Sequence, residues 1–276
     1  RFDVVADFIA FTPDQVERDF RLFDGKAGQF IFISSASAYH KPPLSPFITE
    51  STPLHNPWWQ YSRNKIACEE MLTALYREKG FPATIVRPSH TYCERSIPVA
   101  LHGAKGSYQV IDRLKKGKKV IVQGDGTSLW TLTWSGDFAE AFLGLMGNVH
   151  AIGEAYQITS DEALTWDQIH HTVAAALGVT ANLVHIPSDV LGAKNPDWAG
   201  ALTGDKANCA LFDNGKIKRA VPGFHAPTRF DQGARIALEY IERHPECQTP
   251  DPEFDAWCDR MIEAWERAMD ALPSFR

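Results

Sequence analysis

Residues 29–39 read Gln-Phe-Ile-Phe-Ile-Ser-Ser-Ala-Ser-Ala-Tyr, a nearly continuous apolar run that ends in a cluster of serines. Such a run is typical of a strand that is covered on both faces within a parallel sheet. Further strands are predicted at 2–11 and 83–86, and helices are predicted between the three strands, at 12–23 and 58–79. This strand–helix–strand order indicates right-handed βαβ units, so the predicted fold class is α/β with a parallel sheet.

Three chemically capable segments are predicted to meet at one edge of this sheet. Ser35 follows the strand that ends near residue 33, and Arg-Pro-Ser-His at 87–90 follows the strand of 83–86. Tyr61 begins the helix that lies between these strands in the sequence. Because ligands of parallel sheets bind beyond the carboxyl ends of the strands, this edge is the predicted site.

Tyr61 and Lys65 stand four residues apart and should share one face of the predicted helix. An ammonium group beside a phenol favours the phenolate, so Lys65 is expected to lower the pKa of Tyr61 from its reference of about 10. A hydroxyl at a strand end, such as that of Ser35, could then hydrogen-bond the substrate oxygen on which the tyrosine acts as acid or base.

Composition and charge exclude several classes of protein. The formal net charge of −6 argues against a general nucleic-acid binder, which usually carries a basic face. The basic run at 113–119 is interpreted as a solvated helix end, with a phosphate-binding patch as the alternative. No apolar run approaches the roughly 20 residues that a membrane span needs.

Cysteine and histidine usage predicts no metal site. The five cysteines are scattered, odd in number and never in CxxC spacing, and the ten histidines form no HExxH motif. This pattern favours reduced thiols in a cytoplasmic protein over disulfides or bound zinc.

Taken in order, these residues resemble the extended short-chain dehydrogenase/reductase superfamily, and in particular its NAD-dependent epimerase/dehydratase branch. The resemblance covers nearly the whole chain. It rests on a strand end similar to SS-x-x-x-Y at 34–39, a YxxxK motif at 61–65, Arg87-Pro88, Gly124-Asp125-Gly126 and Gly136-Asp137-Phe138-Ala139.

The resemblance implies a Rossmann-like, doubly wound parallel sheet without its first βαβ units, joined to a smaller C-terminal substrate-binding lobe. Residues 1–98 would form the partial dinucleotide-binding domain, to which 136–160 return, and residues 99–276 would form mainly the substrate lobe and C-terminal helices. A homodimer built on the helices at 12–23 and 58–79 is implied as well.

The family also implies an NAD(P)-dependent epimerase, dehydratase or oxidoreductase that acts on a small hydroxy or keto substrate, sugar-derived compounds included. Tyr61 would be the acid/base, Ser35 the catalytic hydroxyl, and Lys65 the partner of the nicotinamide ribose. NAD or NADP would lie against Ala10, Phe11, Ser34, Tyr61, Lys65, Pro88 and His90. The substrate would lie against Ser37, His90 and Trp130, with Ser34 and Ser37 in supporting positions.

The sequence departs from the family pattern in two places. The glycine-rich dinucleotide fingerprint is absent, so we expect a truncated chain that holds a cofactor poorly. Trp130 stands where many relatives place an Arg, and His90 where they place an Asn. A tryptophan cannot neutralise a diphosphate as a bidentate Arg does, so nucleotide-sugar epimerisation is less expected than for the average member.

Several alternatives stay open. The fold also serves non-catalytic RNA-binding or regulatory proteins, although the Ser35, Tyr61 and Lys65 set argues for an enzyme. A truncated paralogue without cofactor is the third possibility. His90 is either a second acid/base or a satisfied loop histidine, and Trp58 and Trp59 either line a pocket or pack in the core.

Overall fold

The computed structural model describes residues 1–274, and its centre is a four-stranded parallel sheet. The order is β1-β2-β4-β9, with β1 at Phe2–Asp7, β2 at Ala27–Ile33, β4 at Ala83–Pro88 and β9 at Ala155–Ile158. Phe32 is in register with Asp7 on one side and with Ile85 on the other, so the carboxyl ends of these strands form one edge. The predicted α/β fold class with a parallel sheet is confirmed.

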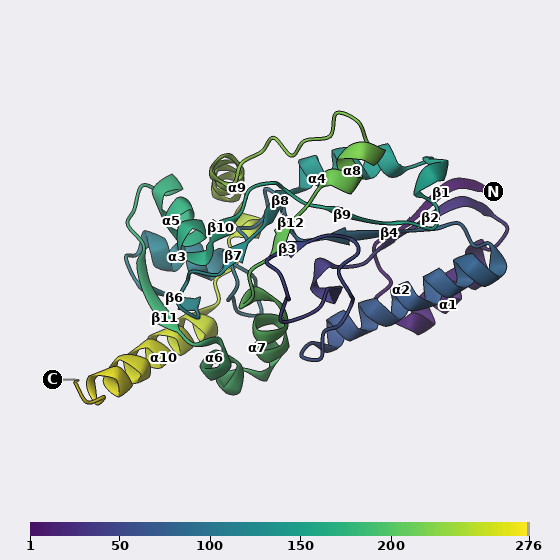
Figure 1. The fold of residues 1–276 in the computed structure, drawn as a ribbon. Coiled ribbons are helices and arrows are strands. Elements are labelled where there is room, and N and C mark those ends of the chain that lie inside the picture. Colours follow the sequence, from purple (N-terminus) through teal and green to yellow (C-terminus); the bar gives the residue numbers. More distant parts are fainter. Residues whose placement is uncertain (275–276) are drawn as a thin grey trace.

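Alternating side chains of β2 build two cores, one on each face of the sheet. Phe30 and Phe32 pack with α1 (Pro13–Phe23) and α2 (Gln60–Lys79), whereas Ile31 packs with α4 (Ser135–Leu145) and α8 (Gly215–Ala220). Figure 1 shows these two pairs of helices on opposite sides of the sheet. The apolar run of β2 therefore reflects burial on both faces.

Local signals set the ends of the two helices that cover the first face. The Gln15 side chain accepts hydrogen bonds from the backbone N–H groups of Phe11 and Thr12 at the start of α1. The Asn56 side chain accepts from the backbone N–H groups of Trp58 and Trp59, just before α2. Gly80 ends α2 with φ at +71°, a left-handed conformation that glycine adopts without steric cost.

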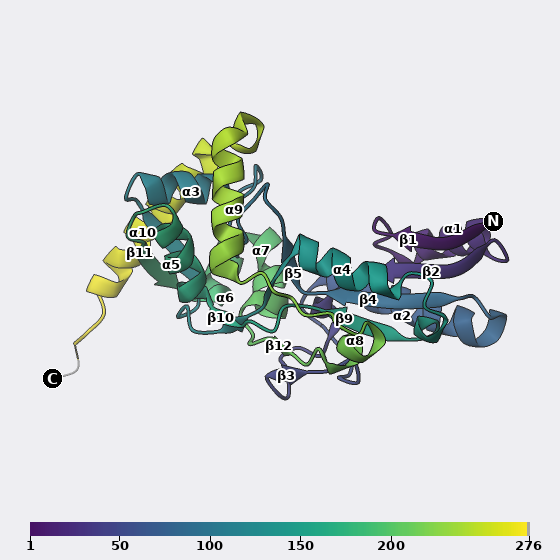
Figure 2. The same ribbon diagram turned by 90° about the horizontal axis from the view of Figure 1, so that it is seen from above.

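A second lobe faces the carboxyl edge of the sheet (Figure 2). It contains the parallel pair β6 (Lys119–Gln123) and β11 (Asn182–Ile186). Four longer helices pack around its core: α3 (Tyr108–Lys115), α5 (Trp166–Ala176), α9 (Phe230–Arg243) and α10 (Pro252–Asp270).

The prediction of a solvated helix end at 113–119 is confirmed only for the exposed Lys115 and Lys116, because Arg113 and Lys118 hold the C-terminal helix α10. The Arg113 guanidinium is almost fully buried and pairs with Asp255 at 2.6 Å and Asp259 at 2.8 Å. Lys118 reaches the same two carboxylates, each at 2.7 Å. A long side chain can bury its stem and still pair its charged end, which composition alone does not reveal.

Short elements were absent from the prediction. The largest group lies between β11 and α8: α6 (Ser188–Lys194), α7 (Pro196–Ala201) and the π-helical turn η3 (Leu202–Lys206). Two small pairs connect the lobes, namely β3 (Phe47–Ile48) with β12 (Leu211–Phe212) and β5 (His90–Tyr92) with β8 (Leu132–Trp134). A third pair, β7 (Leu129–Trp130) with β10 (Leu164–Thr165), lies within the second lobe. Three single turns complete the fold, η1 (Ala36–Ala38), η2 (Val149–Ala151) and η4 (Pro245–Cys247). These short elements lack the continuous apolar runs that identified the strands of the central sheet, so sequence periodicity did not reveal them.

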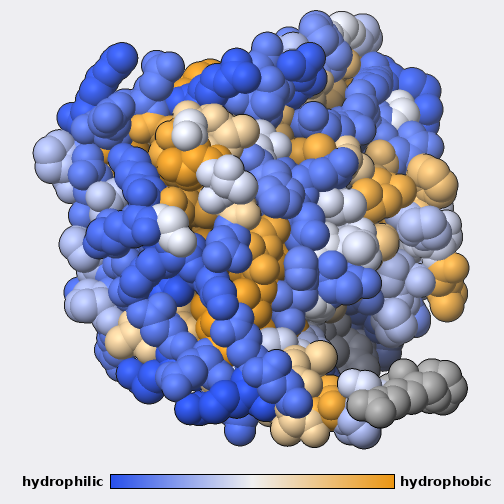
Figure 3. Space-filling model, turned by 90° about the vertical axis from the view of Figure 1, so that its left-hand side faces the viewer, coloured by the Kyte–Doolittle hydropathy of each residue, from blue (hydrophilic) through white to orange (hydrophobic). Residues whose placement is uncertain are grey.

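The surface of the second lobe is largely hydrophilic, with an apolar strip between the polar side chains (Figure 3). Within residues 1–274, no helix combines the length and apolarity that crossing a membrane would require. All five cysteines carry free thiols.

Candidate active site

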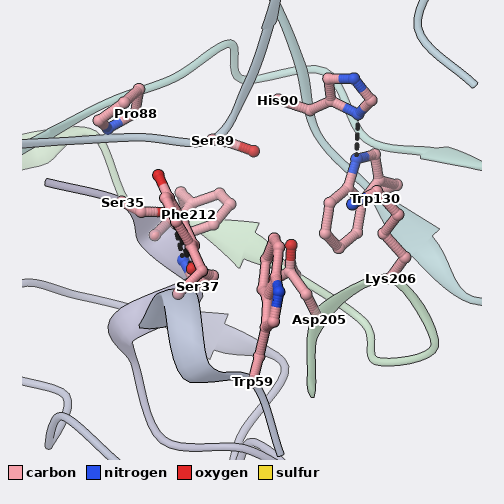
Figure 4. A pocket seen from close by; sticks show the side chains of 13 residues that line it. Ser35, Ser37, Trp59, Pro88, Ser89, His90, Trp130, Asp205, Lys206 and Phe212 are labelled. Atoms are coloured by element: carbon pink, nitrogen blue, oxygen red, sulfur yellow. Dashed lines mark hydrogen bonds between the residues drawn. The ribbon is translucent and has the colours of Figure 1, made fainter. Parts of the chain in front are cut away.

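A cavity of about 190 Å³ opens where the carboxyl edge of the sheet meets the second lobe (Figure 4). Six residues predicted for the site line it: Ser35, Ser37, Tyr61, Pro88, His90 and Trp130. Seven further lining residues are Ala36, Trp59, Ser89, Asp205, Lys206, Ala210 and Phe212. Four predicted residues, Ala10, Phe11, Ser34 and Lys65, do not line this cavity.

Three serine hydroxyls form a hydrogen-bonded chain that ends at the cavity. The Ser62 hydroxyl, on α2 beside Tyr61, donates to the Ser37 hydroxyl at 2.7 Å. The Ser37 and Ser35 hydroxyls are 2.8 Å apart, and Ser35 Oγ also accepts from the Ser37 backbone N–H at 3.1 Å. With Ser37 donating to Ser35, the Ser35 hydrogen stays available to a substrate oxygen. Ser62 was not predicted, although its place between Tyr61 and Lys65 could have indicated it.

The prediction that Lys65 lowers the pKa of Tyr61 is wrong. Burial raises the pKa of Tyr61 above its ordinary value, hydrogen bonding to Ser35 lowers it, and the charge of Asp205 raises it further. The Lys65 Nζ lies 5.9 Å from the centre of the Tyr61 ring, and Lys65 is not among the groups that shift this pKa. The i,i+4 spacing put both residues on one face but did not determine where the ammonium group ends. Tyr61 is thus a protonated phenol at neutral pH.

The Lys65 side chain links the ends of β1 and β2. Its Nζ donates to the carbonyl oxygens of Ala10 at 2.8 Å and Ile33 at 2.7 Å, and it lies over the Phe11 and Phe32 rings. Burial lowers the pKa of Lys65. Lys65 is buried, and because an ammonium group has three N–H donors, these two bonds leave one donor without a protein acceptor.

Ser34 points into the protein interior and not into the cavity, in a supporting position. Its hydroxyl donates to the Glu69 carboxylate, which also pairs with Arg87 at 2.5 Å. The Arg87 guanidinium lies 4.9 Å from the centre of the Tyr39 ring. This buried group joins the ends of β2 and β4 to α2, and so holds Ser35 and Tyr61 in place.

His90 is neutral over the physiological pH range. Burial, with smaller contributions from the charges of Lys206 and His102, lowers the pKa of His90 to about 3. Its Nδ1 accepts a hydrogen bond from Trp130 Nε1 at 3.2 Å, and Trp130 stacks on the buried Trp166. This geometry favours the interpretation of His90 as a satisfied loop histidine over that of a second acid/base.

The opposite wall of the cavity comes from η3, which the sequence did not reveal. Asp205 and Lys206 are on this turn, and Asn56 ties it to the serine side of the cavity. The Asn56 Nδ2 donates to the carbonyl oxygens of Ser37 at 2.8 Å and Gly204 at 2.7 Å.

Two glycines four residues apart are the sequence signal for this wall. A Cβ at Gly200 would lie 2.7 Å from Trp59 Cδ1, and one at Gly204 would lie 2.9 Å from Asn56 Oδ1. Trp59 therefore packs closely on α7 and η3 while it lines the cavity, so both of its proposed roles apply.

No metal site is evident across residues 1–274, since no three His, Cys, Asp or Glu side chains cluster as ligands. A parallel α/β sheet with serine, tyrosine and lysine side chains at its carboxyl edge defines a Rossmann-like fold with a candidate acid/base site. The model of the NAD dependent epimerase/dehydratase family matches residues 21–159, and the chain belongs to this family. The predicted family is therefore confirmed, and the family is NAD-dependent.

Two curated relatives illustrate different functions within this similarity. The chain is 27% identical over 226 residues to N-acetyl-alpha-D-glucosaminyl-diphospho-ditrans,octacis-undecaprenol 4-epimerase of Escherichia coli O157:H7, covering 76% of this chain and 64% of the relative. It is 28% identical over 177 residues to the chloroplast stem-loop binding protein of 41 kDa b of Arabidopsis thaliana, covering 64% of this chain and 43% of the relative. The matched region thus spans less than two thirds of each relative's length.

A solved structure supports the fold assignment. The dTDP-glucose 4,6-dehydratase of Bacillus anthracis str. Ames, in complex with NAD, superposes with a TM-score of 0.70 at 18% identity. The match covers 88% of this chain and 74% of the dehydratase. This similarity concerns the fold.

Proposed function

We propose that this chain carries the acid/base and substrate-binding part of an NAD(P)-dependent epimerase/dehydratase or oxidoreductase. The substrate is a small hydroxy or keto compound, with sugar-derived compounds included. One observation carries the proposal: Ser35 and Tyr61 line one cavity, and Lys65 lies beneath Tyr61, in a member of an NAD-dependent family.

The residues at the sheet edge fit the nicotinamide end of a cofactor, NAD or NADP. When bound, this group would supply the hydride donor and acceptor. Lys65 would hold a ribose hydroxyl with its third N–H, beside Tyr61 and the backbone near Ala10, Phe11 and Pro88. Ser34 would contribute only its backbone, because its hydroxyl is hydrogen-bonded to Glu69. Within residues 1–274 no glycine-rich turn joins a strand of this sheet to a helix.

The protonation state of Tyr61 determines whether it first donates or first accepts a proton. Because burial raises the pKa of Tyr61, its phenol is a proton donor at neutral pH. The phenol donates its proton to a substrate carbonyl oxygen as that oxygen gains negative charge, and the Ser35 hydroxyl donates a second hydrogen bond to the same atom. In the reverse direction, the phenolate accepts the proton of the substrate hydroxyl.

The test compares Tyr61→Phe with the natural protein. We expect turnover, measured as conversion of substrate to product, to fall about 10²- to 10⁴-fold, because general acid–base catalysis contributes that much. The thermal unfolding midpoint should change little, since the phenyl ring still packs against Trp59 and Phe11. Tyr76→Phe, at the far end of α2, is the matched control. Full activity of Tyr61→Phe would refute the mechanism.

RNA binding is the second candidate function, and the stem-loop binding relative is the observation that favours it. The net charge of −6 and the serine, tyrosine and lysine set oppose it. An RNA binder would hold a stem-loop with an affinity that falls steeply with salt. Salt-dependent stem-loop binding together with undiminished function of Tyr61→Phe would favour this candidate over the enzyme.

Two features of organisation complete the proposal. We propose that residues 1–98, with 136–160, form the dinucleotide-binding part and that 99–276 form mainly the substrate lobe; the pairing of β9 with β4 supports this division. We also propose a homodimer through α1 and α2, which a monomer in light scattering would contradict. A cytoplasmic location stays a prediction from the free thiols.

A further inference from the structure

Lys206 places a positive charge in the cavity for which the acid/base mechanism has no use. The residue lines the cavity from η3, on the wall opposite Ser35 and Ser37 (Figure 4). We propose that Lys206 binds a compact oxyanion, a carboxylate or a phosphate, carried by the substrate. This inference deepens the proposed function, because it rests on the cavity being the substrate site.

The charges around Lys206 leave one cation in excess. Its neighbour Asp205 pairs with Lys41 at 3.3 Å, and the Lys41 side chain is only 1% exposed, so it cannot reach a ligand in the cavity. None of the ion pairs formed by residues 1–274 includes Lys206. The pair of Lys41 and Asp205 is neutral as a unit, and Lys206 remains as the uncompensated charge.

The position of Lys206 is fixed by the surrounding structure. Its carbonyl oxygen accepts a hydrogen bond from the Nε1 of Trp166, a fully buried residue, at 3.0 Å. Its Nζ lies 5.4 Å from the centre of the Trp59 ring. Such cation–π contact holds the ammonium group over the indole while its other donors remain open to a ligand.

Trp59 connects this charge to the acid/base residue. The Trp59 and Tyr61 rings are 4.8 Å apart, and the same Trp59 ring contacts Lys206. An anionic group held by Lys206 would therefore set the rest of a small substrate along Trp59 toward Tyr61 and Ser35. Remote binding energy of this kind orients the reacting carbon.

The surroundings favour a single small anion over a diphosphate. The cavity of about 190 Å³ lies below the range of about 300–1,000 Å³ found for pockets of drug-sized ligands. On the same side of the cavity as Lys206 lie the neutral His90 and the indole of Trp130, neither of which neutralises negative charge (Figure 4). One lysine in a small aromatic cavity matches one carboxylate or phosphate.

The burial of the Lys206 ammonium group favours binding of an anion beside it. Burial lowers the pKa of Lys206, the charge of Asp205 partly offsets this, and the charge of Lys41 adds to it. The Lys206 charge also contributes to the lowered pKa of His90, which lies on the same side of the cavity. A bound oxyanion would compensate a charge that the protein itself leaves unpaired.

The experiment titrates lactate, inorganic phosphate and glycerol separately into the 276-residue protein, with binding followed by ligand-observed nuclear magnetic resonance. Lactate carries a carboxylate, phosphate is a bare oxyanion, and glycerol is an uncharged polyol. Constant ionic strength keeps electrostatic screening the same in all titrations. The anion that binds more tightly shows whether the site prefers a carboxylate or a phosphate.

We expect at least one anion to bind in preference to glycerol, and Lys206→Met to weaken it tenfold or more, about 1.4 kcal/mol. Lys206→Gln should weaken it as much, which provides a second variant if the first does not fold. Lys206→Arg should stay within a few-fold of the natural protein. Lys79→Met is the control, because Lys79 is exposed at the far end of α2.

Equal anion affinity in Lys206→Met and the natural protein would overturn the inference, and so would a preference for glycerol. The two proposals fail separately. Full turnover of Tyr61→Phe would refute the mechanism and leave the anion result standing, whereas unchanged anion binding in Lys206→Met would refute only the role of Lys206.

Discussion

The two walls of the cavity are built in different ways. The wall that carries Ser35 and Tyr61 belongs to a strand and a 20-residue helix, and a buried ion pair links that helix to the neighbouring strand. The wall that carries Lys206 is a five-residue turn attached through backbone carbonyls. The proposed acid/base residues thus lie on rigid elements, whereas the proposed anion site lies on a segment that can vary without disturbing the sheet.

The largest loss of stability should come from disrupting the buried ion pair behind the wall that carries Ser35 and Tyr61. In Glu69→Gln, the buried Arg87 loses its counter-charge, which typically costs about 3–5 kcal/mol of unfolding free energy. Glu70→Gln is the matched control, because Glu70 is the exposed neighbour on the same helix. Urea unfolding of both variants measures the difference. Equal losses would show that the buried pair does not hold this wall.

A smaller effect should come from detaching the second wall. Asn56→Ala removes the donor that the Ser37 and Gly204 carbonyl oxygens share, and an unsatisfied buried polar group costs about 1–3 kcal/mol. Anion binding at Lys206 should weaken as well, since η3 loses its tie to the serine side. Asn182→Ala, an exposed residue of β11, is the control. Anion affinity that survives in Asn56→Ala would show that η3 keeps its position without this tie.

The smallest effect concerns pH. Burial lowers the pKa of Lys206 in the folded protein, while an unfolded lysine keeps a pKa of about 10.4. Between these values the unfolded chain binds more protons, so the contribution of Lys206 to stability rises with pH. Lys206→Met should therefore be more stable than the natural protein at neutral pH, and the gap should close as the pH approaches about 10.4. Denaturant unfolding at several pH values measures this gap, with Lys79→Met as the control. A gap independent of pH would contradict the lowered pKa.

The same contrast between the two walls explains which parts of the structure could be predicted from the sequence. The strand of residues 29–33, the cap at Asn56 and the helix that ends at Gly80 each depend on neighbours in sequence, and so they were predictable. The wall on η3 depends on contacts between residues far apart, such as Asn56 with Gly204, and no local pattern encodes them. The spacing of Gly200 and Gly204 was a signal, but its meaning required the position of Trp59.

The chemistry was only partly predictable for a related reason. A helical spacing of four residues brings Tyr61 and Lys65 to one face, but it does not determine the path of a four-carbon side chain. The Lys65 Nζ reaches the carbonyl oxygens of Ala10 and Ile33, which depend on the sheet and not on the helix. The pKa of Tyr61 therefore follows burial, which sequence spacing does not report.

The place of Trp59 gives the protein a built-in optical reporter. Its indole is in contact with Tyr61 on one side and with the Lys206 ammonium group on another. Indole emission responds to nearby charge, so neutralising Lys206 should shift the fluorescence of this one tryptophan, and Trp59→Phe should abolish that change. Ligand binding in the cavity could then be followed by tryptophan fluorescence before any substrate is known.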